Sequence, residues 1–255
     1  MSNTSEHIPF ESVAPIILQN NTYPDYPFVR FSGTGFFLQF LPYEEIYFVT
    51  ARHCMLDDDG KVSERIRVQY ENDEEIVFSE YLTTSYIDNE DEIEDVFVFV
   101  VKELDSDKIE SLKERSLKLN HQDNIQFIIN NIINTKENIR TVGFPSVSKE
   151  INEMNDSKQI AVTQPRGFYG KIINDTNIRN RYKINQISWK EGGLGGFSGS
   201  PILSLYPDEK GKVIPVVLGV LLTGSSSAAQ FISINVVTDL IASYIKKNKL
   251  TKKSS

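Results

Sequence analysis

Residues 191–201 read EGGLGGFSGSP, the densest run of glycine in the chain. Five of the 14 glycines lie between Gly192 and Gly199, around a single serine, Ser198. Glycine permits positive φ and a close approach of other atoms, which a turn needs if it is to present its N–H groups to a ligand. The segment leads directly into residues 201–205, an apolar run typical of a β-strand. The pattern favours an anchored turn that presents the Ser198 hydroxyl over the alternative, a flexible surface loop.

Two further segments carry side chains that could act with this serine. Residues 46–54, IYFVTARHC, place His53 at the end of a β-rich run, although a single histidine is more often structural. Residues 94–101, EDVFVFVV, place Asp95 directly before an apolar strand, whereas Asp91, the alternative carboxylate, is not followed by one. A serine hydroxyl becomes nucleophilic when an imidazole takes its proton, and a carboxylate fixes the imidazole tautomer. The three segments together supply those three groups.

The rest of the chain predicts a mostly β protein. Short runs rich in Val, Ile, Phe and Tyr recur between Gly, Pro, Asn and Asp, as in sandwiches and barrels. The predicted strands are 36–40, 46–50, 66–70, 75–78, 96–101, 141–144, 160–163, 184–188, 201–205 and 216–222. Residues 105–120 and 235–247 space their apolar side chains as helices do, and residues 125–133 fit a helix or a strand equally.

Composition excludes several classes of function. The 255 residues carry 27 basic and 35 acidic side chains, a net charge of −8, which is opposite to the positive footprint of a nucleic-acid-binding protein. The chain has one cysteine, Cys54, and three histidines, His7, His53 and His121. These cannot build a zinc finger, an HExxH helix or a thiolate cluster, so we expect no metal and no cofactor. An intramolecular disulfide is impossible with one cysteine.

The sequence also predicts where the protein works. Its first ten residues lack the basic region and the apolar core of a signal peptide. The longest apolar stretches, 96–101 and 213–222, are much shorter than the roughly 18–20 residues that span a bilayer. We therefore expect a cytoplasmic protein with no membrane association, which fits the unpaired Cys54.

In order along the chain, these motifs resemble those of the trypsin/chymotrypsin-like serine peptidase family, in a bacterial-type, intracellular form. Residues 33–37 resemble its glycine-bearing strand before the histidine, and residues 50–54, TARHC, its Thr-Ala-Ala-His-Cys. Residues 95–98, DVFV, resemble its Asp-Ile-Ala-Leu, and residues 196–201, GFSGSP, its Gly-Asp-Ser-Gly-Gly-Pro. Segments 142–145 and 170–172 and the C-terminal helix extend the resemblance over nearly the whole chain.

The resemblance implies an all-β fold of two Greek-key β-barrels packed together, chymotrypsin-like, with a C-terminal α-helix. The implied domains are residues 1–120, an N-terminal barrel with His53 and Asp95 plus a linker helix; residues 121–234, a second barrel with Ser198; and residues 235–255, a C-terminal helix and basic tail.

The resemblance also implies a serine endopeptidase that cleaves a protein or peptide substrate. His53 would be general base and then general acid, Asp95 would orient it, and Ser198 would attack. The backbone N–H groups of Gly196 and Ser198 would form the oxyanion hole. The substrate pocket would comprise Gly192, Leu222, Thr223 and Gly224, which carry no charge, so an uncharged P1 residue is expected.

Two departures from the family pattern bear on activity. Phe197 stands where digestive members have the Asp that pairs with a newly cleaved N-terminus, so we expect regulation by a protein partner rather than activation by that route. Leu222 aligns with a serine that hydrogen-bonds the triad aspartate. Two alternatives remain open: a silent pseudoenzyme that acts as a protein-binding module, and a latent peptidase whose oxyanion loop a partner orders.

Overall fold

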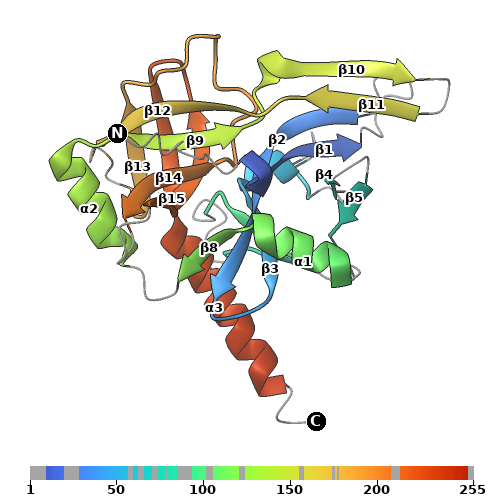
Figure 1. Cartoon of the computed structure of the whole chain (residues 1–255), viewed down its shortest axis with the longest axis horizontal. Helices are drawn as coiled ribbons and strands as arrows, with labels where there is room; N and C mark the ends of the chain where they lie inside the picture. The colour runs from blue at the N-terminus through green and yellow to red at the C-terminus, as the bar shows by residue number, and fades with distance from the viewer. Residues whose placement is uncertain are drawn as a thin grey trace.

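The computed structural model of the chain describes residues 10–19, 29–56, 60–62, 66–70, 74–78, 80–84, 94–101, 106–120, 124–154, 158–173, 176, 178–207 and 213–251. The architecture is mostly β, with a closed barrel, a second sheet and a helix at the C-terminal end (Figure 1). This arrangement confirms the predicted mostly β fold with a barrel and a C-terminal helix.

The described residues of the N-terminal half form one sheet of eight strands. Its order is β5-β4-β1-β2-β3-β7-β6, and β8 pairs in parallel with β2. The bounds are β1 (Val13–Gln19), β2 (Val29–Leu41), β3 (Ile46–Thr50), β4 (Ile66–Tyr70), β5 (Glu74–Val77), β6 (Tyr81–Leu82), β7 (Phe97–Val100) and β8 (Leu117–Asn120). Every residue of β3 and β7 is buried, which explains why these strands are continuously apolar rather than alternating. Among the described residues, the pairing of this half does not close into a barrel.

The C-terminal half forms the closed barrel, in the order β12-β13-β16-β15-β14-β9. Its strands are β9 (Ile139–Gly143), β12 (Arg166–Ile173), β13 (Arg181–Asn185), β14 (Pro201–Pro207), β15 (Val213–Gly224) and β16 (Ala228–Ser233). Along β13, buried and half-buried residues alternate, as expected where one face of a strand points into the barrel. The chain between β9 and β12 forms a separate two-stranded hairpin, β10 (Lys149–Met154) and β11 (Lys158–Thr163), which projects beyond the ends of those two strands (Figure 1).

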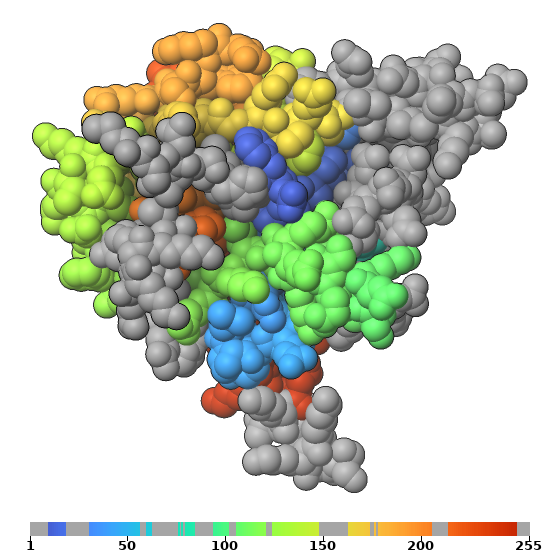
Figure 2. All heavy atoms as spheres, in the orientation of Figure 1, coloured from blue at the N-terminus to red at the C-terminus, as the bar shows by residue number. Residues whose placement is uncertain are grey.

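Over the described ranges, three α-helices accompany the strands: α1 (Ser106–Arg115), α2 (Ile125–Thr135) and α3 (Ile234–Thr251). The ambiguous segment 125–133 is helical, and the Asn124 side chain caps it by accepting a hydrogen bond from the Phe127 N–H at 3.0 Å. In the space-filling view, α1 (green) forms the surface beside β1 (blue) (Figure 2).

The predicted helix at 105–120 is wrong over its last four residues. These residues form β8, in which Leu117 and Leu119 are buried and Lys118 and Asn120 are exposed. That period of two belongs to a strand, whereas the looser helical period ends with α1. Ser116 closes the helix, because its N–H and its hydroxyl both donate to the Leu112 carbonyl, at 2.8 and 2.6 Å.

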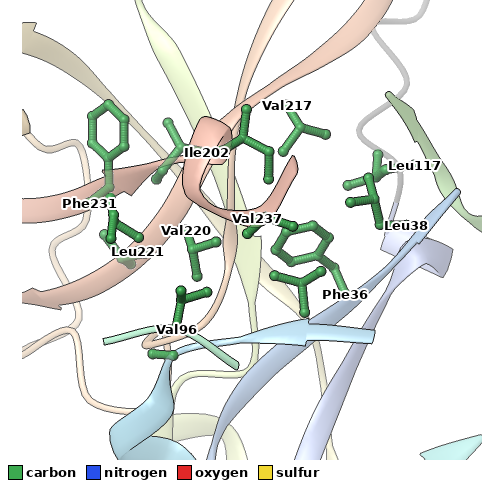
Figure 3. Close-up of a cluster of buried hydrophobic side chains, with 14 of the residues drawn as sticks. Phe36, Leu38, Val96, Leu117, Ile202, Val217, Val220, Leu221, Phe231 and Val237 are labelled. Atoms are coloured by element: carbon green, nitrogen blue, oxygen red, sulfur yellow. The ribbon is translucent and has the colours of Figure 1, made fainter. Parts of the chain in front are cut away.

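A shared hydrophobic core joins the two halves. Figure 3 shows this cluster, with Val237 of α3 lying between side chains of the sheet and side chains of the barrel. The sheet side contributes Phe36, Leu38, Val96 and Leu117, and the barrel side contributes Ile202, Val217, Val220, Leu221 and Phe231. Because both halves bury their apolar faces against each other, polar groups at the boundary between them are held in fixed positions.

Candidate active site

The pairing of β3 with β7 brings His53 and Asp95 together. The two strands run antiparallel with Thr50 opposite Phe97, so the end of β3 lies beside the start of β7. His53 belongs to a short 3₁₀ turn, η2 (Arg52–Met55), directly after β3, and Asp95 comes two residues before β7. Two residues that are 42 positions apart in the sequence are therefore in direct contact.

Asp95 contacts His53 through both carboxylate oxygens. Its Oδ2 lies 2.7 Å from the imidazole Nδ1, and its Oδ1 accepts a hydrogen bond from the His53 backbone N–H at 2.9 Å. The side chains are 43% and 27% exposed, so the pair lies at the rim of the core and is reachable from solvent. Because one oxygen is committed to the main chain, the carboxylate cannot rotate freely, and its other oxygen fixes the direction of the ring.

The contact shifts the pKa of both groups. The hydrogen bond to Asp95, followed by contacts with Cys54, raises the pKa of His53 above its ordinary value of 6.5. Burial alone would raise the pKa of Asp95, but the hydrogen bond and charge of His53 outweigh it and hold that pKa below its ordinary value. Asp95 is therefore ionised at neutral pH, as a carboxylate that stabilises an imidazolium must be.

A second ion pair lies next to Asp95 and links the two halves. The guanidinium of Arg181, at the start of β13, lies 3.8 Å from the Glu94 carboxylate. Burial raises the pKa of Glu94, while Arg181 and a hydrogen bond from Asn180 oppose that shift. The positive charge of Arg181 also helps to keep the pKa of Asp95 low.

Ser198 is half-buried in the turn between Gly196 and β14, and its hydroxyl donates to the Leu222 carbonyl of β15 at 2.7 Å. The Leu222 side chain is buried, so this residue faces the serine with its carbonyl. The Ser198 carbonyl accepts from the Thr34 N–H at 2.8 Å and from the Cys54 thiol at 3.5 Å. The main chain of the turn is thus attached to β2 and η2, the part of the sheet that carries the histidine.

Within the described part of the chain, the turn leaves the backbone N–H groups of Gly196 and Ser198 without a hydrogen bond to the neighbouring loops. The Gly195 carbonyl accepts from the Ser146 N–H at 2.7 Å, and the Phe197 carbonyl accepts from the Ser200 N–H at 2.9 Å. In a planar trans peptide the C=O and N–H point in opposite directions. The N–H groups of Gly196 and Ser198 therefore point away from those partners, and among the described residues neither donates to a backbone carbonyl outside the strands. Donors that are not used within the fold are available to a ligand, which is one requirement of an oxyanion hole.

Phe197 anchors the turn in the barrel. Its side chain is fully buried and meets Phe168 and Trp189 edge-to-face, with ring centroids 5.1 Å away in each case. Aromatic pairs in this geometry contribute about 0.5–1.5 kcal/mol beyond the burial of their area. A core contact thus occupies the position that the resemblance assigns to an ion pair with a cleaved N-terminus.

The four predicted pocket residues lie on two neighbouring segments. A Cβ on Gly224, at the end of β15, would come within 2.7 Å of the Leu194 side chain, so β15 borders the segment 192–195. Gly192, in that segment, is exposed with a φ of +105°, and a Cβ there would meet nothing within 4 Å. Thr223 is exposed beside Gly224. Gly192 and Gly224 therefore bring no side chain to these segments, and Thr223 of β15 is uncharged.

Three residues considered from the sequence, His7, His121 and Asp91, lie outside the described residues. Over the part of the chain that is described, no group of three or more His, Cys, Asp or Glu side chains could hold a metal ion. Within those same ranges no helix is both long enough and apolar enough to cross a membrane.

Sequence reasoning missed two residues that hold the turn. Thr34 of β2 and Ser146 of the short turn η4 (Ser146–Ser148) supply hydrogen bonds to it from distant parts of the chain. Thr34 stands between two glycines in the motif SGTGFF, and a hydroxyl in an otherwise apolar, glycine-flanked strand is the signal that could have identified it. Ser146 acts through its backbone N–H, so its side chain gives no signal.

The fold and the placement of these groups define a chymotrypsin-like protease fold. The crystal structure of the protease Anisep from Arthrobacter nicotinovorans matches 92% of this chain and 95% of its own, with a TM-score of 0.55 and 14% sequence identity. At that identity the likeness shows the fold alone. No protein-family model matches the chain, and no curated protein sequence matches it.

Proposed function

We propose that the chain is a serine endopeptidase that cleaves protein substrates through an acyl-enzyme, with His53, Asp95 and Ser198 as its catalytic residues. The observation that carries the proposal is the two-point contact of Asp95 with His53. A carboxylate that accepts from both the ring and the main chain of one histidine orients the imidazole for a single task. The Anisep likeness supports a peptidase through fold alone.

The reaction begins with rotation of the Ser198 side chain from the Leu222 carbonyl toward the imidazole Nε2. This gives up one hydrogen bond, a net cost of about 1 kcal/mol. His53 then takes the hydroxyl proton while Oγ attacks the scissile carbonyl, whose oxygen becomes an oxyanion facing the N–H groups of Gly196 and Ser198. Each such donor is worth about 3 kcal/mol in the transition state. His53 next gives the proton to the leaving amine, and water repeats the sequence to release the acyl group.

We propose an uncharged P1 residue, because Gly192, Thr223 and Gly224 bring no charge to the pocket wall. The expected result of a peptide-library cleavage profile is enrichment of apolar or small polar residues at P1. A profile dominated by Lys, Arg or Glu would contradict it.

A second candidate function is a silent or latent member of the same fold. The observation that favours it is the Ser198 hydroxyl, which donates to the Leu222 carbonyl. In a silent module this arrangement would be permanent, whereas in a latent peptidase a protein partner would release it. Burial of Phe197 supports control by such a partner over control by N-terminal cleavage. A cytoplasmic site of action is part of the proposal, supported by the buried, free thiol of Cys54.

Labelling with a fluorophosphonate tests the proposal, because the reagent reacts only with an activated serine. We expect the native chain to be labelled on Ser198 and the Ser198→Ala variant to remain unlabelled. Ser204, buried on β14, provides the matched control, since Ser204→Ala should be labelled like the native chain. Labelling of the native chain only after addition of cell lysate would identify a latent peptidase. No labelling under either condition would overturn the peptidase proposal in favour of the silent module.

A further inference from the structure

We propose that the Thr34 hydroxyl is a positioning group that sets the oxyanion hole, so that the sheet half of the molecule controls the geometry of a site built on the barrel half. This inference rests on the proposed peptidase function. Thr34 touches none of the reacting atoms and would act through the main chain of the serine turn.

Thr34 holds two of the four carbonyls of the turn. Its hydroxyl donates to the Gly196 carbonyl at 2.8 Å, and its backbone N–H donates to the Ser198 carbonyl at 2.8 Å. These carbonyls belong to the two residues whose N–H groups would bind the oxyanion. The other two carbonyls, of Gly195 and Phe197, are held from within the barrel half.

The same hydroxyl also holds the segment that faces the turn. The Phe144 N–H donates to Thr34 Oγ1 at 2.9 Å, two residues before Ser146, whose N–H holds the Gly195 carbonyl. The hydroxyl is thus both donor and acceptor. It joins the serine turn to residues 144–146. The contact between these two segments, through the Ser146 N–H and the Gly195 carbonyl, fixes the peptide that carries the Gly196 N–H. Removing the hydroxyl leaves the buried Phe144 N–H and the half-buried Gly196 carbonyl without this partner and frees that peptide to rotate.

Burial makes the arrangement rigid. Thr34 is fully buried, and Thr50, also fully buried, donates its hydroxyl to the Thr34 carbonyl at 2.7 Å. A Cβ on Gly196 would come within 2.8 Å of the Ser146 nitrogen, so this turn is pressed against residues 144–146. A preorganised donor costs no reorganisation when charge develops on the substrate oxygen, and for that reason fixed donors contribute most to catalysis.

Three variants separate this role from a general effect on stability. Thr34→Val keeps the shape of the side chain and removes the hydroxyl, while Thr34→Ser keeps the hydroxyl. Thr141→Val is the matched control, because Thr141 is also fully buried and its hydroxyl donates to the Pro201 carbonyl at 2.9 Å, within the barrel. The measurements are the rate of fluorophosphonate labelling of Ser198 and the hydrogen exchange of the Phe144 amide.

We expect Thr34→Val to label about 10–100-fold more slowly, part of the loss caused by removing an oxyanion-hole donor outright. Its Phe144 amide should exchange faster than in the native chain. Thr34→Ser and Thr141→Val should label at nearly the native rate. Native labelling by Thr34→Val, or equal slowing by Thr141→Val, would overturn the inference.

The exchange measurement separates failure of this inference from failure of the proposed function. If the native chain itself is not labelled, the peptidase proposal fails, and the positioning role is judged on the Phe144 amide alone. Faster exchange in Thr34→Val but not in Thr141→Val then supports the role of the hydroxyl in holding the turn. Unchanged exchange in Thr34→Val overturns it. If Thr34→Val does not fold, the same two measurements on Thr34→Ser decide. Native labelling and native exchange support a hydroxyl that holds the turn, and slower labelling with faster exchange overturns it.

Discussion

The Asp95→Asn variant is expected to react with a fluorophosphonate about 10⁴-fold more slowly than the native chain, because the substitution selects the wrong imidazole tautomer. The His53 backbone N–H needs an acceptor and would retain the carbonyl oxygen of the new amide side chain in the place of Oδ1. The amide NH₂ would then face Nδ1, which must accept rather than donate. The ring proton moves to Nε2, and that nitrogen can no longer take the proton of Ser198.

Glu94→Gln is the matched control for this experiment. It removes one negative charge from the neighbouring position but leaves both oxygens of Asp95 in place, so we expect a far smaller loss of labelling rate. Equal losses of labelling rate in the two variants would show that the rate depends on negative charge near the site and not on the tautomer of His53. A native rate in Asp95→Asn would contradict the assigned role of Asp95.

The pH profile gives Asp95→Asn a second readout. His53 acts as a base only when neutral, so labelling of the native chain should rise with pH through a midpoint above 6.5. The His53–Asp95 ion pair changes the free energy of unfolding in the opposite direction. Its stabilisation is fully present below pH 6.5 and is lost as the pH rises through the raised pKa of His53. In Asp95→Asn the first cause of that raised pKa is gone, so the midpoint should move down toward 6.5. A titration of the His53 ring by NMR measures both values.

The sequence predicted the strands that frame the site because those strands are apolar without interruption. Residues 46–50 form β3 with the predicted bounds, and residues 96–101 contain β7. A strand that is buried on both faces is apolar along its whole length, so it can be recognised from its own residues without knowledge of its neighbouring strands. By contrast, β8 was predicted as the end of a helix, because its four residues become a strand only by pairing with β2.

The chemistry of the site divides in the same way. His53, Asp95 and Ser198 were singled out because an imidazole, a carboxylate and a glycine-flanked hydroxyl are distinctive in their sequence contexts, and the structure brings His53 and Asp95 into contact. The bond from the Ser198 hydroxyl to the Leu222 carbonyl was not predicted, since it depends on a side-chain rotation and on a backbone group with no sequence signature. The hydrogen bonds of Thr34 escaped prediction for a related reason: both partners of its hydroxyl are main-chain groups more than 100 residues away.

The Gly199→Ala variant is expected to lose more than about 4 kcal/mol of its free energy of unfolding, enough to leave a marginally stable domain largely unfolded. Gly199 has a φ of +86°, and its N–H donates to the Leu221 carbonyl at 2.7 Å. A Cβ there would overlap the Thr34 carbonyl oxygen and the Thr50 hydroxyl, and would lie 3.0 Å from the Ala51 nitrogen. Main-chain atoms that are themselves hydrogen-bonded cannot move aside without breaking the contact between the two halves.

Gly60→Ala separates this overlap from the cost of the backbone conformation. Gly60 also has a positive φ, +76°, but a Cβ there would meet nothing within 4 Å. Its loss should therefore be limited to the strain of a left-handed alanine, about 1–2 kcal/mol. Urea denaturation of the two variants and the native chain measures the difference. Equal losses at both glycines would show that backbone strain alone is responsible and that the close approach of Gly199 to β2 and β3 does not affect stability. A much larger loss at Gly199 would show that the contact of the serine turn with β2 and β3 requires a glycine.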